Sequence, residues 1–213
     1  MKYQMAAKEL HNIEEWADFQ VKPSKFVVDS DAIEIADFLR NEGYIMVDRT
    51  IKATIPIKKD KVFSRLCRIP LERKDKLENR IFEIAKQAFL PDSRFFDRAN
   101  TSEDEKREAI CAFVDEMKSF YICRFKGEIA GFLEVVPDGE RQDQAIIRLA
   151  AVDEKYRVAG VATALYAGAV EKCREQGIKK LWGRISSRNM AVMNLYASLG
   201  AAFSQPLDVY VRR

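Results

Sequence analysis

The chain has 213 residues, of which 47% are hydrophobic and 32% charged, with a net charge of +3, so its length suits one large domain or two small ones. No apolar run approaches the roughly 20 residues that span a bilayer, and charge returns before a signal-peptide core could form, so we expect no membrane segment and a cytoplasmic location. Positive and negative residues are interleaved, which argues against a nucleic-acid partner.

The first part of the chain has the pattern of a small α/β unit. Residues 29–40 carry apolar side chains at helical spacing, which predicts a helix. Residues 44–57 alternate between apolar and polar side chains, which predicts a half-buried strand. Residues 76–89 return to helical spacing, and Pro91 ends this helix. We therefore expect an N-terminal α/β domain over residues 1–92.

A second domain is expected over residues 93–213. Ser102 followed three residues later by Glu105 is typical of a capping box at the start of a helix. After this helix, strand and helix patterns alternate, and glycines end the helices. The expected elements are strands over 120–125 and 128–136 joined by a Lys126-Gly127 turn, a strand over 145–152, a helix over 160–176, a strand over 180–185, a helix over 189–199 and a strand over 208–212.

The cysteines and the single histidine do not form a reactive or metal-binding pattern. Cys67, Cys111, Cys123 and Cys173 are widely spaced, with no C-x-x-C pair, and His11 lies near the N-terminus. We therefore expect neither a zinc site nor a cysteine nucleophile with a histidine base.

The segment with the strongest functional signal is a predicted strand, a short loop and a helix start. Arg157-x-x-Gly160-x-Ala162 lies where the loop passes into the helix. The first turn of a helix leaves amide groups without partners, and the helix dipole makes that end electropositive, so it can hold a pyrophosphate. Gly160 and Ala162 leave room for such a ligand, and Arg157 and Lys155 add positive charge. The alternative is an ordinary strand-loop-helix with glycine at the turn.

A second motif lies farther downstream. Asn189-Met-Ala-Val-Met-Asn-Leu-Tyr-Ala-Ser-Leu-Gly resembles the N-x-x-A-x-x-L-Y-x-x-L-G hallmark of the GNAT acetyltransferases, and the Arg157 motif resembles that family's Q/R-x-x-G-x-G/A signature. Both hallmarks occur in the family's order. The resemblance implies an α/β (α+β) GNAT fold, a mixed central sheet with splayed parallel strands flanked by helices, preceded here by the smaller N-terminal domain. It also implies acetyl-CoA as cosubstrate, without a metal.

By this resemblance, both motifs hold the coenzyme. The pantetheine arm would pair with the first splayed strand, as a peptide extends a sheet edge, and Asn189 would contact the arm from the far side. Val158 and Ala159 stand where many relatives carry glycine or a basic residue, which weakens the expected grip on the pyrophosphate. The expected coenzyme-binding residues are Ala150, Ala151, Val152, Arg157, Val158, Ala159, Gly160, Val161, Ala162, Thr163 and Asn189.

Two residues are candidates for the proton transfers. Tyr196 lies two helical turns after Asn189 on the same face, and the resemblance points its phenol at the coenzyme sulfur as general acid. Its alternative role is that of a core aromatic with a bonded hydroxyl. Glu134, on the strand before the coenzyme strand, is the best placed carboxylate to deprotonate the amine; it could equally be a solvated strand residue, with a water relay as base. Arg148 is interpreted as an edge or substrate-facing cation.

A narrower resemblance concerns the acceptor. Residues 41–57, the Ser93-Arg94-Phe95-Phe96-Asp97 stretch and the terminal Val209-Tyr-Val-Arg are similar to the TDP-fucosamine acetyltransferases and relatives that acylate amino-sugar nucleotides. This resemblance implies transfer to the 4-amino group of a TDP-amino sugar for a surface polysaccharide, with Arg94, Phe95 and Phe96 near the sugar-nucleotide cleft. The alternative for these aromatics is a buried pair that anchors a linker.

Two other functions remain open from sequence. One is a GNAT enzyme that acetylates a different amine, such as a protein N-terminus, an amino acid or an antibiotic. The other is an acyl-CoA-binding module without turnover. The sequence also leaves a homodimer open.

Overall fold

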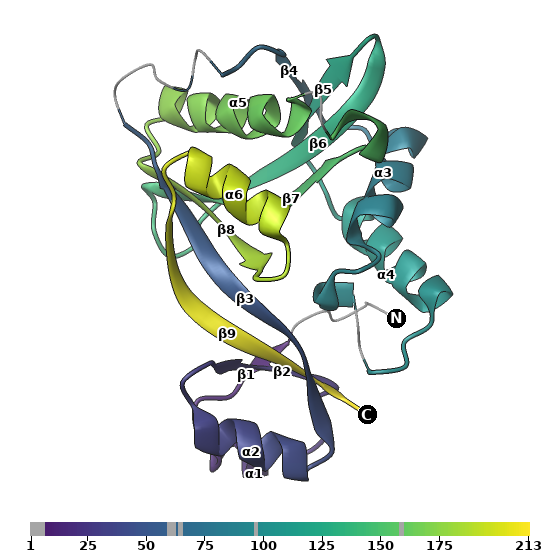
Figure 1. Cartoon of the computed structure of the whole chain (residues 1–213), viewed down its shortest axis with the longest axis vertical. Helices are drawn as coiled ribbons and strands as arrows, with labels where there is room; N and C mark the ends of the chain where they lie inside the picture. The colour runs from purple at the N-terminus through teal and green to yellow at the C-terminus, as the bar shows by residue number, and fades with distance from the viewer. Residues whose placement is uncertain (1–6, 59–62, 64–65, 96–97, 158–159) are drawn as a thin grey trace.

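The computed structural model describes residues 7–58, 63, 66–95, 98–157 and 160–213, and within them one sheet runs through the whole molecule (Figure 1). Its nine strands have the order β1-β2-β9-β3-β8-β7-β6-β5-β4. The strands are β1 (Lys8–Glu9), β2 (Lys25–Asp29), β3 (Tyr44–Pro56), β4 (Leu71–Lys74), β5 (Phe120–Phe125), β6 (Glu128–Pro137), β7 (Gln144–Val152), β8 (Lys180–Ser186) and β9 (Ala202–Arg212).

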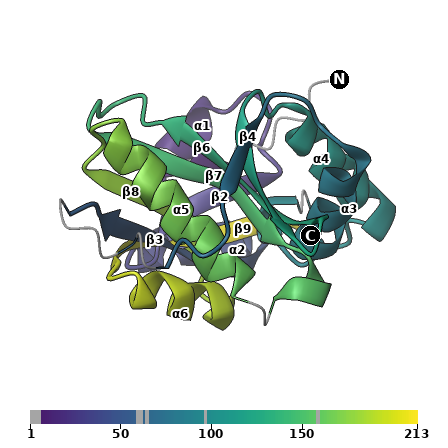
Figure 2. The same cartoon turned by 90° about the horizontal axis from the view of Figure 1, so that it is seen from above.

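The helices lie on both faces of this sheet. They are α1 (Glu15–Asp18), α2 (Ile33–Asn41), α3 (Asn79–Phe89), α4 (Glu103–Asp115), α5 (Val161–Glu175) and α6 (Met190–Ser198), with 3-10 turns η2 (Ser93–Phe95) and η3 (Glu154–Tyr156). Alternation along β6 separates two cores, because Leu133 packs with the helix α5 residues and Phe132 packs with those of α3 and α4. Figure 2 shows α5 and α6 on one side and α3 and α4 on the other. The mixed α/β architecture expected from the sequence is confirmed.

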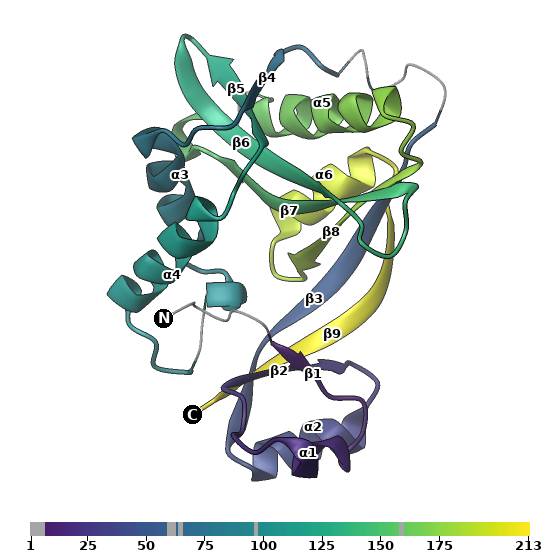
Figure 3. The same ribbon diagram turned by 180° about the vertical axis from the view of Figure 1, so that it is seen from behind.

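The parallel strands β7 and β8 pair over a short stretch and then part. Their register joins Gln144 to Lys180, Ala145 to Leu181 and Ile146 to Trp182, and no further pair follows in the described residues. Beyond this point β7 continues to Val152 and β8 to Ser186. The two strands therefore diverge like the arms of a V, as Figure 3 shows from behind, and their facing edges have no strand partner among the described residues. We call this the β7–β8 gap.

The N-terminal residues form a small lobe around a third core. Phe26, Tyr44 and Tyr210 are buried there with Leu10, Val28, Ile35 and Leu39, and the ring of Trp16 lies 5.4 Å from that of Phe26. The long strands β3 and β9 run from this lobe into the rest of the sheet (Figure 1).

The domain boundary expected after residue 92 does not coincide with a break in the sheet. β3 pairs antiparallel with both β8 and β9, and β4 pairs with β5. Residues 44–56 and 71–89 are therefore built into the same sheet and helical layer as the C-terminal region, because their apolar faces are completed by strands that come much later in the chain.

Most helices and strands after residue 100 begin and end close to the predicted positions. The capping box of α4 is confirmed, since Ser102 Oγ accepts from the Glu105 amide at 3.2 Å and Glu105 Oε2 accepts from the Ser102 amide at 2.7 Å. The sequence analysis missed α1, β1, β2 and β4, and predicted only the second half of β9. Residues 202–205 are exposed, so they lack the apolar pattern of a strand. No helix within the described residues is long and apolar enough to cross a membrane.

Candidate active site

The hydroxyl of Tyr196 lies where the two arms of the β7–β8 gap part. Tyr196 is only 1% exposed. A Cβ atom placed on Gly183 would stand 2.4 Å from its hydroxyl oxygen and 3.5 Å from the carbonyl oxygen of Ile147. Gly183 and Ile147 directly follow the last paired residues of β8 and β7, Trp182 and Ile146. Only a residue without a side chain at position 183 leaves room for the phenol at this point.

A second tyrosine from α5 supports this phenol. The rings of Tyr166 and Tyr196 meet edge to face, with centroids 5.3 Å apart. Burial raises the pKa of Tyr166 to about 12, although the Tyr196 hydroxyl and the charge of Arg94 oppose the shift. Burial and the neighbouring Tyr166 raise the pKa of Tyr196 well above its usual value, against the charge of Arg94. Both phenols therefore stay protonated at neutral pH, so Tyr196 can serve as a proton donor.

The β7 arm presents backbone to the gap. Beyond Ile146 no described strand pairs with β7 on the β8 side, while β6 pairs with its other edge. Ala150 and Val152 are half-buried and Ala151 is buried, so small side chains line this edge. An extended ligand with amide groups could add to such an edge as a strand does.

The β7 arm leads through η3 to the start of α5. Gly160 is the N-cap residue, with φ +75° and no side-chain cap bond, and its carbonyl oxygen accepts from the Ala164 amide at 3.0 Å. The positive φ favours glycine, which gives a second reason for Gly160 besides the room it would leave for a ligand, since a Cβ there would meet no protein atom within 4 Å. The amides of the first turn, which includes Val161, Ala162 and Thr163, have no intrahelical partners and can bind an anion.

Arg157 and Lys155, the two cationic residues before this helix, differ in whether a carboxylate already pairs with them. Arg157 is exposed, and its side chain has no ion-pair partner among the described residues. Lys155, in contrast, is ion-paired with Glu128 at 3.1 Å. Val158 and Ala159 lie outside the described residues.

Asn189 is the N-cap residue of α6. Its Oδ1 accepts from the Val192 amide at 3.1 Å, and the residue is exposed. The bond fixes the side-chain carbonyl toward the helix, and its NH2 group remains to face a ligand. Tyr196 follows on the same helix, so one element positions both predicted residues.

Glu134 of β6 and the half-buried Arg148 of β7 form an ion pair between these two strands. The Glu134 side chain is 5% exposed, and its Oε2 accepts from Arg148 Nε. Arg148 occupies a bulge of β7, because Glu134 pairs with Leu149 while the next residue of β6 pairs with Ile147. The guanidinium also lies 4.4 Å from the ring centre of Phe113 in α4. Glu134 is therefore held by an arginine and is not the solvated strand residue considered as its alternative.

The turn η2 is hydrogen-bonded both to β7 and, through Asp48 of β3, to the end of β8. Ser93 Oγ donates to Asp48 Oδ2 at 2.8 Å, and Ser186 Oγ, at the end of β8, donates to Asp48 Oδ1 at 2.8 Å. On the β7 side, Arg94 Nη1 donates to the carbonyl oxygen of Arg148 at 3.1 Å. Burial alone would raise the pKa of Asp92, but the adjacent Arg94 guanidinium outweighs it and holds that pKa below its usual value.

Of the two aromatic residues in the 93–97 stretch, the structure describes Phe95. Phe95 is 2% exposed and packs between Phe89 and Phe113, so it has the alternative role of a buried anchor and does not line an open cleft. Phe96 lies outside the described residues. Among the described residues of this stretch, Arg94 is the one that contacts the backbone of β7.

A comparison with known families covers the chain from α3 to α6. The model of the acetyltransferase (GNAT) family matches residues 79–201, more than half of the chain. The chain belongs to the GNAT acetyltransferase family. Membership implies acetyl transfer to an amine, with acetyl-CoA as the general donor of the family. A comparison with curated protein sequences gave no match. The described residues contain no group of three or more side chains suited to hold a metal ion.

Solved structures share the GNAT fold at low sequence identity. A functionally unknown conserved protein from Staphylococcus epidermidis has a TM-score of 0.59 and 11% identity, over 89% of this chain and 72% of that one. A GCN5-related N-acetyltransferase from Sphaerobacter thermophilus has a TM-score of 0.53 and 12% identity, over 92% and 62%. An acetyltransferase of the GNAT family from Colwellia psychrerythraea has a TM-score of 0.52 and 11% identity, over 89% and 65%. The chain thus spans less than two thirds of the latter two proteins.

Sequence reasoning missed three residues of this candidate site. Gly183 and Tyr166 surround the Tyr196 hydroxyl, and Asp48 joins η2 to β8. Asp48 and Gly183 carried a faint signal, because a carboxylate and a glycine are both unusual within strands.

Proposed function

We propose that this GNAT protein transfers the acetyl group of acetyl-CoA to a primary amine, with Tyr196 as the general acid. The observation that carries the proposal is the position of the Tyr196 hydroxyl at Gly183, where β7 and β8 part. A thioester placed in the gap would bring its sulfur next to a phenol that stays protonated.

The coenzyme would follow the chain from β7 to α5. The pantetheine arm would add to the free edge formed by Ala150, Ala151 and Val152. The pyrophosphate would lie on the start of α5, where unpartnered amides and the helix dipole favour negative charge. The N-cap residue, Gly160, has no side chain of its own to occupy these amides. The residues proposed to bind the pyrophosphate and the pantetheine arm also include Arg157, Val158, Ala159, Gly160, Val161, Ala162, Thr163 and Asn189.

The chemistry requires one base and one acid. The amine attacks the thioester carbonyl carbon after losing a proton, and the tetrahedral intermediate collapses with the thiolate as leaving group. Tyr196 would donate its hydroxyl proton to that sulfur. Glu134 is the proposed base, oriented by Arg148, with its Oε1 facing the proton because Oε2 is bound by the arginine. A water between the amine and Glu134 would complete the path.

For the acceptor, we propose the 4-amino group of a TDP-amino sugar. The support is the resemblance of residues 41–57 and of the stretch around Arg94. These two segments meet in space, since Asp48 of β3 accepts from Ser93 of η2, and both adjoin the gap. Other amines, such as protein N-termini, amino acids or antibiotics, are the alternatives. Polysaccharide biosynthesis, a cytoplasmic location and a homodimer stay predictions.

The test of the proposal is acetyl transfer by a Tyr196→Phe variant. The variant should bind acetyl-CoA, seen as a raised melting temperature, because a ligand of the folded state stabilises it. Its single-turnover transfer rate should fall about 10²–10⁴-fold, which is the usual contribution of positioned acid catalysis. Tyr121→Phe removes a hydroxyl from β5, away from the gap, and is the matched control. Equal rates in wild type and Tyr196→Phe would exclude the acid role, and no response to acetyl-CoA would exclude the donor.

A further inference from the structure

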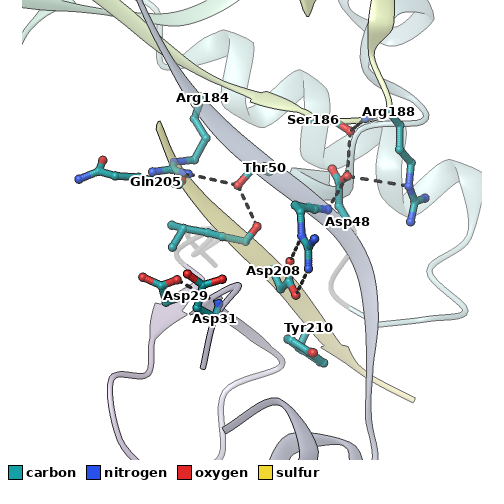
Figure 4. A network of polar contacts seen from close by, with 12 residues as sticks. Asp29, Asp31, Asp48, Thr50, Arg184, Ser186, Arg188, Gln205, Asp208 and Tyr210 are labelled. Atoms are coloured by element: carbon teal, nitrogen blue, oxygen red, sulfur yellow. Dashed lines mark hydrogen bonds and ion pairs between the residues drawn. The ribbon is translucent and has the colours of Figure 1, made fainter. Parts of the chain in front are cut away.

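One face of β8 and β3 is lined with polar and cationic side chains next to the gap. Because a Cβ on Gly183 would point at Tyr196, the next residue, Arg184, projects from the opposite face of β8. The register pairs Arg184 with Lys52 and Ser186 with Thr50, so these side chains share that face. Arg184 is thus one residue beyond the start of the gap, on the side away from α6. Figure 4 shows Arg184, Thr50, Ser186 and their neighbours on this face.

Arg184 lacks the counterion that the other arginines of this region have. Its Nη1 donates to the Gln205 carbonyl oxygen at 2.9 Å and to Thr50 Oγ1 at 3.4 Å, both uncharged acceptors. No carboxylate of the described residues lies within ion-pair distance of it. In contrast, Arg49 is paired with Asp208 at 2.6 Å, Arg94 with Asp92 at 2.7 Å, and Arg148 with Glu134.

Burial makes this lack of a counterion costly. The Arg184 side chain is half-buried, and burial lowers the pKa of its guanidinium, with partial compensation by the charge of Glu9. A partly buried charge without a partner is unfavourable unless a ligand supplies the opposite charge. Its Nε and Nη2 have no hydrogen-bond acceptor among the described residues, so a planar donor edge is left for an anion.

The position of the guanidinium sets a distance to the gap. Gln205 belongs to β9, which is separated from β8 by β3. Since neighbouring strands are about 4.8 Å apart, a guanidinium bound to that carbonyl oxygen lies roughly 5–10 Å from the β8 arm. The gap lies on the other edge of β8, so an amine in the gap and an anionic group at Arg184 would be farther apart than this, by the length of a sugar ring with its linker or of an alkyl chain of several carbons.

We infer that Arg184 binds an anionic group, a phosphate or a carboxylate, of the acceptor while the acceptor's amine reaches the β7–β8 gap. This inference rests on the proposed acetyl transfer and names the residue and the charge class that select the acceptor. Lys52, which shares the face, adds to the attraction. A polycationic acceptor would be repelled by the same two residues.

The test compares acceptors with and without an anionic group. The pairs are glucosamine 6-phosphate with glucosamine, a TDP-4-amino-4,6-dideoxyhexose with the free amino sugar, and 6-aminohexanoate with its methyl ester. Wild type should prefer the anionic member of at least one pair by roughly tenfold or more in kcat/KM, which is the usual scale of a charge-assisted hydrogen bond. Which pair shows the preference distinguishes phosphate from carboxylate.

Variants assign the preference to Arg184. Arg184→Gln should reduce the preference for the anionic acceptor at least tenfold, mainly by raising KM for that acceptor. Arg184→Lys should keep most of the preference. Arg174→Gln, which removes the same charge from an ion pair on α5, is the control and should leave it unchanged. A wild-type enzyme that acetylates neutral or cationic amines equally well overturns the inference but leaves acetyl transfer intact. An unchanged preference in Arg184→Gln overturns it as well.

A binding measurement tests whether Arg184 holds an anion, independently of acetyl transfer. With the coenzyme site saturated by CoA, calorimetric titration with TDP and with glucose 6-phosphate should give at least one affinity that falls tenfold or more in Arg184→Gln. Equal affinities, or no binding of either anion to wild type, overturn the inference. Failure of acetyl-CoA itself to bind would instead overturn the proposed function.

Discussion

Replacement of Gly183 by alanine should displace the Tyr196 hydroxyl. The added Cβ would lie 2.4 Å from that oxygen, about 1 Å inside the roughly 3.4 Å of an ordinary contact, while its other neighbours are at 3.5 and 3.6 Å. Gly183 is not among the residues with positive φ, so the backbone accepts alanine and the effect comes from the phenol alone. A displacement of this size typically costs about 10²-fold in rate, and overpacking costs about 1–3 kcal/mol of stability.

A double-mutant cycle isolates the contact. Unfolding free energy from denaturant titration and the single-turnover acetyl-transfer rate would be measured for Gly183→Ala, Tyr196→Phe and the double variant. Removal of the Tyr196 hydroxyl removes the clash with the new Cβ. Gly183→Ala should therefore lower the free energy of unfolding by at least about 1 kcal/mol less in the Tyr196→Phe background than in wild type. A cycle with no coupling, or a Gly183→Ala enzyme as fast and as stable as wild type, would refute the placement of the phenol in the gap.

The remaining predictions concern pH and helix capping. Burial raises the pKa of Cys123 and Cys173 to about 11, so as the pH rises these thiols ionise first in the unfolded chain. The free energy of unfolding should therefore be unaffected by them below their ordinary pKa. It should fall between about pH 9 and 11, by roughly 3 kcal/mol per thiol. Cys173→Ala should flatten this fall in pH-dependent denaturation, and an unchanged slope would contradict it. The raised pKa of Tyr196 predicts that kcat shows no alkaline loss from this phenol below about pH 10. Ser102→Ala should lower the melting temperature by roughly 2–4 °C, because it removes the cap of α4, whereas Ser198→Ala, at an exposed position of α6, should change it little.

Local sequence patterns predicted the elements that build most of the site. Ser102 with Glu105, and Asn189 before the Tyr196 helix, act over three residues, so the capping they predict is visible in the chain itself. The Arg157 motif likewise marked the junction between β7 and α5, because the backbone at Gly160 requires a positive φ. Periodicity also placed β7, β8 and α6 in the right order.

Contacts between distant segments were beyond such patterns. Strand β2 pairs with the last strand of the chain, and Asp48 meets Ser93 and Ser186 from two other segments. The same holds for Arg184, whose missing counterion becomes apparent only when β8, β3 and β9 lie side by side. The boundary after residue 92 stays a prediction, but the pairing of β3 with β8 and of β4 with β5 across it could not be read from local patterns.

Hydrogen–deuterium exchange with and without saturating acetyl-CoA tests the central claim most directly, because it reports which backbone amides the coenzyme covers. Binding in the β7–β8 gap predicts slower exchange in residues 147–152 and 161–164, the free edge of β7 and the first turn of α5, with little change in β2 and α2. Protection confined to other segments, or no protection at concentrations that saturate the thermal shift, would contradict the account.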